Sequence, residues 1–167
     1  GSFWWRSVDQ HEKNYDDMQQ YFNSGEFDVP LVRFHYADRE DVFDVVSYPK
    51  GGRILNMLRH YLGNDAFDAS LHKYLTDNKF KNGEAQQLRL AFESVTGQDL
   101  NWYWNEWYYG AGHPILDISY VYDDAAHKAS VIVQQKQTQQ IFKMPVNIDI
   151  YNGAIKTRHQ VWIQNAV

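Results

Sequence analysis

The chain has 167 residues, of which 44% are hydrophobic and 16% aromatic, with a formal net charge of −5 and no cysteine. This hydrophobic content is typical of a globular protein and excludes a disordered chain, and the net acidic charge argues against a nucleic-acid-binding face. The lack of cysteine excludes disulfides, thiolate-bound zinc and a thiol nucleophile, and no apolar run approaches the roughly 20 residues of a membrane span.

The first two-thirds of the chain has the periodicity of helices. Apolar residues recur at helical spacing over 3–22, and Pro49 suits the first turn of a second helix that Gly63 ends. Three further helices are expected: one capped by Asn64-Asp65, one over 84–95 that Gly97 stops, and one over about 99–109.

Beyond residue 113 the apolar period changes from 3.6 to 2, which is typical of half-buried strands. Strands are expected at about 116–122, 129–135, 144–150 and 155–163, and Asn152-Gly153 predicts a two-residue hairpin loop between the last two. Helices followed by antiparallel strands predict an α+β fold in two segregated units. We expect residues 1–113 to form a helical bundle. Residues 114–167 should form a small antiparallel β-sandwich or sheet, truncated because four strands are few for a sandwich.

One segment carries part of a zinc-peptidase pattern. Such an enzyme needs two histidines one helical turn apart, with a glutamate between them as general base. His11 and Glu12 begin the pattern, but Tyr15 stands where the second histidine belongs. The other histidines lack ligand spacing, so we expect no metal site in this chain.

The segment from Asp41 to Gly52 contains the best candidate for a catalytic residue, Tyr48. It precedes Pro49, and a residue before proline is steered away from helical angles. We therefore expect Tyr48 at a bend between an extended segment and a helix start, beside the positive end of that helix. There its hydroxyl can donate a hydrogen bond to charge developing on a substrate oxygen. The alternative is a tyrosine that only packs.

The residues around Tyr48 also resemble a known family. The run Ser47-Tyr48-Pro49-Lys50-Gly51-Gly52, followed by Ile54-Leu55-Asn56-Met57-Leu58, resembles the Y-x-K-G element and the next helix of the aminopeptidase N family of zinc metallopeptidases (gluzincins). The segment from Trp107 to Gly112-His113-Pro114 is similar to the family's W…G-x-P junction between the catalytic domain and a β-sandwich domain. The resemblance implies that residues 1–113 are the C-terminal portion of a catalytic domain and that 114–167 begin the next domain.

In that family the tyrosine of Y-x-K-G hydrogen-bonds the oxyanion of the tetrahedral intermediate, while zinc polarises the carbonyl and a glutamate activates water. The resemblance implies a catalytic role for Tyr48 and a place for Phe43 in the wall of the first substrate pocket. Lys50, Gly51 and Gly52 are expected to shape the helix entrance. The family's zinc ligands and amine-binding loop belong upstream of Phe3. We therefore expect a fragment of a zinc-dependent aminopeptidase that acts on peptides, inactive and without zinc until completed by the upstream part of its domain.

Two other functions fit the same residues. The parent protein can be a non-catalytic scaffold or peptide-binding relative of the same fold, or this segment can be a stand-alone binding domain that uses the aromatics from Trp102 to Tyr109. We expect those aromatics instead to pack between the helical and β units. A piece of a larger domain should expose an apolar face and self-associate, whereas a natural domain should be monomeric. Composition names no compartment, and a soluble protein of the cell envelope, periplasm or cytoplasm fits equally.

Overall fold

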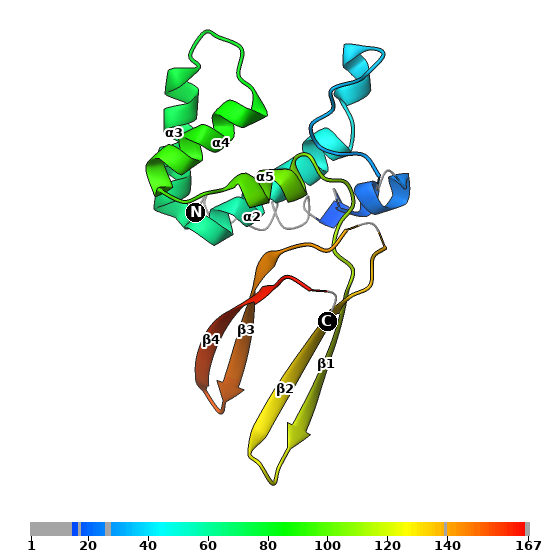
Figure 1. Cartoon of the computed structure of the whole chain (residues 1–167), viewed down its shortest axis with the longest axis vertical. Coiled ribbons are helices and arrows are strands. Elements are labelled where there is room, and N and C mark those ends of the chain that lie inside the picture. Colours follow the sequence, from blue (N-terminus) through cyan, green and yellow to red (C-terminus); the bar gives the residue numbers. More distant parts are fainter. Residues whose placement is uncertain (1–14, 17, 26–27, 139, 166–167) are drawn as a thin grey trace, which may run out of the picture. The chain divides into compact units, whose positions relative to one another are not determined.

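A computed structural model of the chain describes residues 15–16, 18–25, 28–138 and 140–165 (Figure 1). It divides into two compact units, Gly1–Ala111 and Gly112–Val167. The regular elements of the first unit are helices and those of the second are antiparallel strands, which confirms the predicted α+β fold. The helix expected over 3–22 falls mostly outside the described residues, although residues 18–24 are helical.

The helical unit contains six named elements within its described residues. A 3-10 helix η1 and a π-helix η2 precede four α-helices: η1 Arg39–Val42, η2 Val46–Lys50, α2 Gly51–Leu62, α3 Asn64–Asp77, α4 Ala85–Thr96 and α5 Asn101–Trp107. Gly97 ends α4 in the left-handed conformation, with a φ of 68°, as predicted. Gly63 ends α2 as predicted, but it also occupies the position before α3, where no side chain caps the helix. The predicted cap by Asn64-Asp65 is therefore wrong.

Aromatic rings form the core of this unit. Phe67 of α3 meets Phe92 of α4 edge to face, with ring centroids 5.3 Å apart. Phe92 in turn lies 6.3 Å from Trp104 of α5, and Trp104 stacks on Tyr108 at 4.6 Å. Phe92 and Trp104 are fully buried, so the end of α5 is held by rings that belong to three helices.

The second unit consists of two hairpins (Figure 1). Strands β1 Leu116–Asp123 and β2 Lys128–Gln135 pair from Leu116↔Gln135 to Asp123↔Lys128. Strands β3 Met144–Asn152 and β4 Ile155–Ile163 pair from Met144↔Ile163 to Asn152↔Ile155. The predicted hairpin is present, but its two loop residues are Gly153 and Ala154, because Asn152 still pairs with Ile155. Gly153 has a φ of 60°, which glycine adopts without steric cost.

Glutamine side chains join the two hairpins along the segment that connects them. Gln135, at the end of β2, donates to the Phe142 carbonyl (2.8 Å) and accepts from the Phe142 backbone N–H (2.9 Å). Gln137 donates to Gln135 Oε1 (2.6 Å) and accepts from the backbone N–H of Ile115 (2.9 Å). Both glutamines are buried, and these bonds satisfy their amides. The glutamines thus replace sheet pairing at this join.

Candidate functional site

Tyr48 lies inside the π-helix η2, which continues directly into α2. The bend expected from its place before Pro49 is therefore wrong, and proline chemistry explains why. In an α-helix Pro49 would clash with the Val45 carbonyl four residues earlier and has no N–H to donate to it. Instead the Lys50 N–H, five residues on, donates to that carbonyl at 3.1 Å. One wider turn accommodates the proline without breaking the helix.

Tyr48 and Phe43 form an exposed aromatic pair. Tyr48 is 62% exposed and Phe43 is 61% exposed, and their ring centroids lie 6.0 Å apart with a 36° angle between the planes. Within the described ranges, no residue makes a hydrogen bond with the Tyr48 hydroxyl. The two residues that the sequence singled out are thus neighbours, and the phenol is available to a ligand.

A charged pair lies at the start of η2, where Asp44 directly follows Phe43 in the chain. Arg33 binds Asp44 through both terminal nitrogens, at 2.5 Å and 3.1 Å. One of these nitrogens, Nη2, also donates to the Ser47 hydroxyl at 2.7 Å. Asp44 in turn accepts from the backbone N–H groups of Val46 (3.1 Å) and Ser47 (2.8 Å). The carboxylate therefore fills the role of a helix N-cap for η2.

The pKa of Asp44 reflects these contacts. Burial acts to raise it, but hydrogen bonds from Arg33 and from the Ser47 backbone, together with the Arg33 charge, outweigh burial and lower the pKa below its usual range. Asp44 is therefore ionised at neutral pH and remains a full acceptor for the turn.

Lys50 and Gly51 face inward, as expected of residues that shape the helix entrance. Lys50 is only 7% exposed and donates to the Val29 carbonyl at 3.3 Å. Burial lowers its pKa to about 8. A Cβ at Gly51 would lie 3.3 Å from Leu31 Cδ1, whereas one at Gly52 would meet nothing within 4 Å. Of these two glycines, Gly51 is the one with a close neighbour.

The aromatics of α5 are core residues and not a ligand platform. Tyr103, Trp104, Trp107 and Tyr108 are all buried. The Tyr103 hydroxyl donates to the Ile54 carbonyl of α2 (2.6 Å), and Trp104 Nε1 donates to the Ala85 carbonyl of α4 (2.9 Å). Burial raises the pKa of both Tyr103 and Tyr108, so these hydroxyls stay neutral. The contacts described here lie within the helical unit, so packing of these aromatics between the helical and β units stays a prediction.

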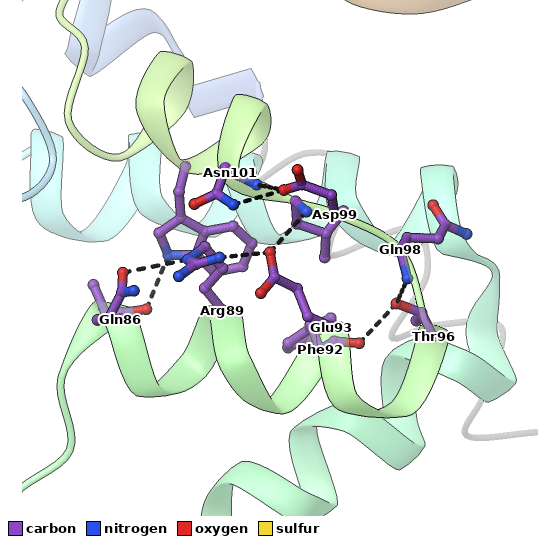
Figure 2. A network of polar contacts seen from close by, with 11 residues as sticks. Gln86, Arg89, Phe92, Glu93, Thr96, Gln98, Asp99 and Asn101 are labelled. Atoms are coloured by element: carbon purple, nitrogen blue, oxygen red, sulfur yellow. Dashed lines mark hydrogen bonds and ion pairs between the residues drawn. The ribbon is translucent and has the colours of Figure 1, made fainter.

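A second charged pair closes the corner between α4 and α5 (Figure 2). Arg89 donates to Glu93 at 2.6 Å, and the same carboxylate oxygen accepts the backbone N–H of Leu100 at 2.9 Å. Asp99 caps the start of α5 by accepting from the Asn101 backbone N–H at 2.8 Å. These bonds fix the path of the chain from Gly97 to α5.

The described residues do not supply a metal site. Within those ranges, no three His, Asp or Glu side chains are close enough to hold an ion, and His11 and Glu12 lie outside them. A pocket of about 310 Å³ between α3 and α4 is lined by other residues than Tyr48 and Phe43: Lys73, Asp77, Asn78, Lys81, Gln87, Leu90 and Ala91. In the described part of the chain, no helix is long and apolar enough to cross a membrane.

Comparison with known proteins decides the family. The peptidase family M1 domain matches residues 5–107. The chain belongs to peptidase family M1. Within this family, Aminopeptidase M1 of Arabidopsis thaliana is 32% identical over 49% of the chain and 9% of its own length. Aminopeptidase A of Gloydius brevicauda is 39% identical over 46% of the chain and 8% of its own length.

The M1 resemblance extends beyond residue 107. Aminopeptidase N of Lactococcus lactis subsp. lactis is 25% identical over 81% of the chain and 16% of its own length. The crystal structure of Legionella pneumophila aminopeptidase A in complex with aspartic acid matches with a TM-score of 0.71 at 13% identity, over 85% of this chain and 17% of that one. The chain therefore spans less than a fifth of the length of these proteins, and it shares the fold of the Legionella structure. As the resemblance of its motifs implied, the chain is a member of the aminopeptidase N family of metallopeptidases.

Arg33 is the residue that sequence reasoning missed. It follows Pro30 in a connector without periodicity, and its partners Asp44 and Ser47 lie 11 and 14 residues away. No helical or strand spacing joins such positions. The only signal available was Asp44 itself, an acidic residue three positions before Ser47 at the start of a helix.

Proposed function

We propose that this chain supplies the oxyanion-binding tyrosine of an M1 aminopeptidase that hydrolyses N-terminal residues from peptides. Tyr48 is the proposed catalytic residue, and Phe43 is proposed to form part of the wall of the first substrate pocket. Membership of a family whose relatives are aminopeptidases supports the reaction class. The observation that carries the role of Tyr48 is its exposed side chain, whose hydroxyl has no hydrogen-bond partner among the described residues, on a turn that Arg33 and Asp44 bind.

Peptide hydrolysis is faster when a hydrogen-bond donor is already oriented before the substrate binds. When a peptide carbonyl is attacked, negative charge develops on its oxygen, and a fixed donor stabilises that charge more than it stabilises the ground state. A tyrosine hydroxyl donates one such bond. The neighbouring Phe43 ring, 6.0 Å from that of Tyr48, offers an apolar surface to the side chain next to the scissile bond.

The remainder of the active site is proposed to come from the rest of the parent protein. The described residues do not fit a metal ion, so no step of this proposal passes through a metal bound to them. We propose that residues 1–113 are the C-terminal part of the catalytic domain and that residues 114–167 begin the β domain after it. By itself the chain is expected to bind no catalytic zinc and to cleave nothing.

The test is Tyr48→Phe in the full-length protein, with turnover of a peptide substrate and metal content measured together. Loss of an oxyanion donor costs roughly 100- to 1000-fold in kcat, and the metal should be retained. Tyr36→Phe is the matched control, because Tyr36 is also exposed (58%) in the same unit. This variant should have the turnover of the wild type. Unchanged turnover in Tyr48→Phe would show that Tyr48 is not the donor.

The alternative is a non-catalytic scaffold or peptide-binding relative of the same fold, in which the full-length protein binds peptides without turning them over. The same assay separates the two, since a wild-type protein with bound metal and no turnover supports the scaffold. Self-association of the isolated chain also stays a prediction. Exposed apolar side chains on both hairpins favour it: Ile118, Tyr120, Tyr122, Val131, Ile155 and Trp162.

A further inference from the structure

The connector before η1 is tied to the turn that carries Tyr48 by a charged network. We infer that Arg33 is a positioning residue for Tyr48, which it holds through Asp44 and Ser47. This inference rests on the proposed function, because it gives Arg33 a part in catalysis only if Tyr48 touches the substrate.

The hydrogen bonds that the Arg33 side chain makes with described residues all go to the segment that leads into Tyr48. Besides the two bonds to Asp44 and the one to Ser47, Nη1 donates to the Asp41 carbonyl at 3.4 Å. The guanidinium thus contacts three positions between the end of η1 and the residue before Tyr48. Its side chain is 15% exposed and that of Asp44 is 21% exposed. A planar fork that binds one carboxylate through two nitrogens gives a defined orientation, which a flexible surface ion pair does not.

Tyr48 needs such support because packing gives it little. Its side chain is mostly exposed and has the Phe43 ring beside it, and Phe43 is equally exposed. On its C-terminal side, Pro49 has no N–H to contribute. Its own backbone N–H donates to the Asp44 carbonyl at 3.2 Å. The backbone that aims the phenol is therefore fixed from residues 44–47, where the Arg33 contacts converge.

The Arg33 hydrogen bonds can be removed while residues 29–32 keep their other contacts to the helical unit. Val29 accepts from Lys50, Leu31 packs on Gly51, and the Val32 N–H donates to the Tyr108 carbonyl at 2.8 Å. These three attachments do not involve Arg33. A variant at Arg33 should therefore fold and leave the turn in place, while the angle of the phenol is less restricted.

The test is a double-mutant cycle in the full-length protein with Arg33→Met, Tyr48→Phe and both together. Misplacement of a reacting group by about 1 Å can cost 100-fold, so we expect Arg33→Met to lower kcat by roughly 10- to 100-fold. KM should change by less than about threefold, and the bound metal should be retained. In the Tyr48→Phe background, Arg33→Met should change kcat by less than about threefold, because there is no phenol left to position.

Two controls keep the result specific. Arg39→Met removes an arginine of the same unit whose side chain is 85% exposed and pairs with Glu40 on the surface, so its kcat should be that of the wild type. Ser47→Ala removes one 2.7 Å bond and leaves the Arg33–Asp44 pair in place. It should lower kcat several-fold and substitutes for Arg33→Met in the cycle if that variant does not fold.

The outcomes separate this inference from the proposed function. If Tyr48→Phe lowers kcat and Arg33→Met does not, the positioning role is wrong and the catalytic tyrosine stands. If Arg33→Met lowers kcat equally in both backgrounds, Arg33 acts independently of Tyr48 and the inference is overturned. If Tyr48→Phe has full turnover, the proposed function fails and this inference fails with it.

Discussion

The corner between α4 and α5 and the turn at Tyr48 contain the same kind of ion pair, one beside buried residues and the other beside exposed ones. In each, an arginine binds a carboxylate that also accepts backbone N–H groups: Glu93 accepts from Leu100, and Asp44 accepts from Val46 and Ser47. The corner lies beside Phe92, Leu100 and Trp104, which are all fully buried. The turn instead carries two aromatics that are more than 60% exposed. The ion pair itself thus does not indicate a function, and the two pairs differ in the exposure of the aromatic residues near them.

The largest test of this contrast is Trp104→Ala. Removing a fully buried tryptophan loses its apolar burial and leaves a cavity, which typically costs about 3–5 kcal/mol. The bond from Nε1 to the Ala85 carbonyl is lost as well. Urea unfolding should therefore give a large loss of stability, and Trp102→Ala on the same helix should lose less because Trp102 is only half-buried. An equal loss in the two variants would contradict the assignment of Trp104 to the core.

Glu93→Ala should have the next largest effect. It leaves the Leu100 N–H without its acceptor and Arg89, whose side chain is 9% exposed, without its charged partner, so that Arg89 keeps only its bond to Gln86 at 3.3 Å. An unsatisfied buried polar group costs about 1–3 kcal/mol. Glu93→Gln keeps an acceptor oxygen and should recover part of that loss in the same unfolding assay. If Glu93→Gln were as unstable as Glu93→Ala, the N–H contact would not be the source of the effect.

Lys50 should give the smallest effect, visible as a pH dependence. Its pKa is about 8 in the folded chain, against about 10.4 in an unfolded one. Between these values the unfolded state binds the proton and the folded state does not, so stability should rise as pH increases from 8 to 10. The gain is on the order of 1 kcal/mol, because water that reaches the ammonium screens part of the burial penalty. Lys50→Met should lack this rise in thermal unfolding measured across the same pH range.

The elements of the chain were predictable where the deciding forces are local. Gly97 ends α4 because a left-handed residue is needed there, and the strands β1 to β4 follow the alternation of apolar residues. The cap of α3 was predicted wrongly because Gly63 serves both helices and leaves Asn64 inside the first turn. The hairpin loop shifted by one residue because pairing continues to Asn152 and Ile155.

The residues of the candidate site could be named from the sequence, but their arrangement in space could not. Tyr48 and Phe43 were recognised from the motif, and the structure brings their rings to 6.0 Å. The bend before Pro49 was a sound local expectation. The helix instead continues through the proline, because the Lys50 N–H donates to the Val45 carbonyl five residues earlier. The Arg33 network joins positions 11 and 14 residues apart across an irregular segment, so only the folded chain reveals it.

The π-helix at Val46–Lys50 has a consequence for how insertions and deletions would act. A π-turn contains one residue more than an α-turn, and each residue of an α-helix turns the chain by about 100°. Deletion of Pro49 would remove both the extra residue and the ring that prevents a regular helix, but it would rotate Phe43, Asp44 and the residues before them by that angle relative to α2. The extra residue of the π-turn therefore sets the direction in which the preceding chain enters α2.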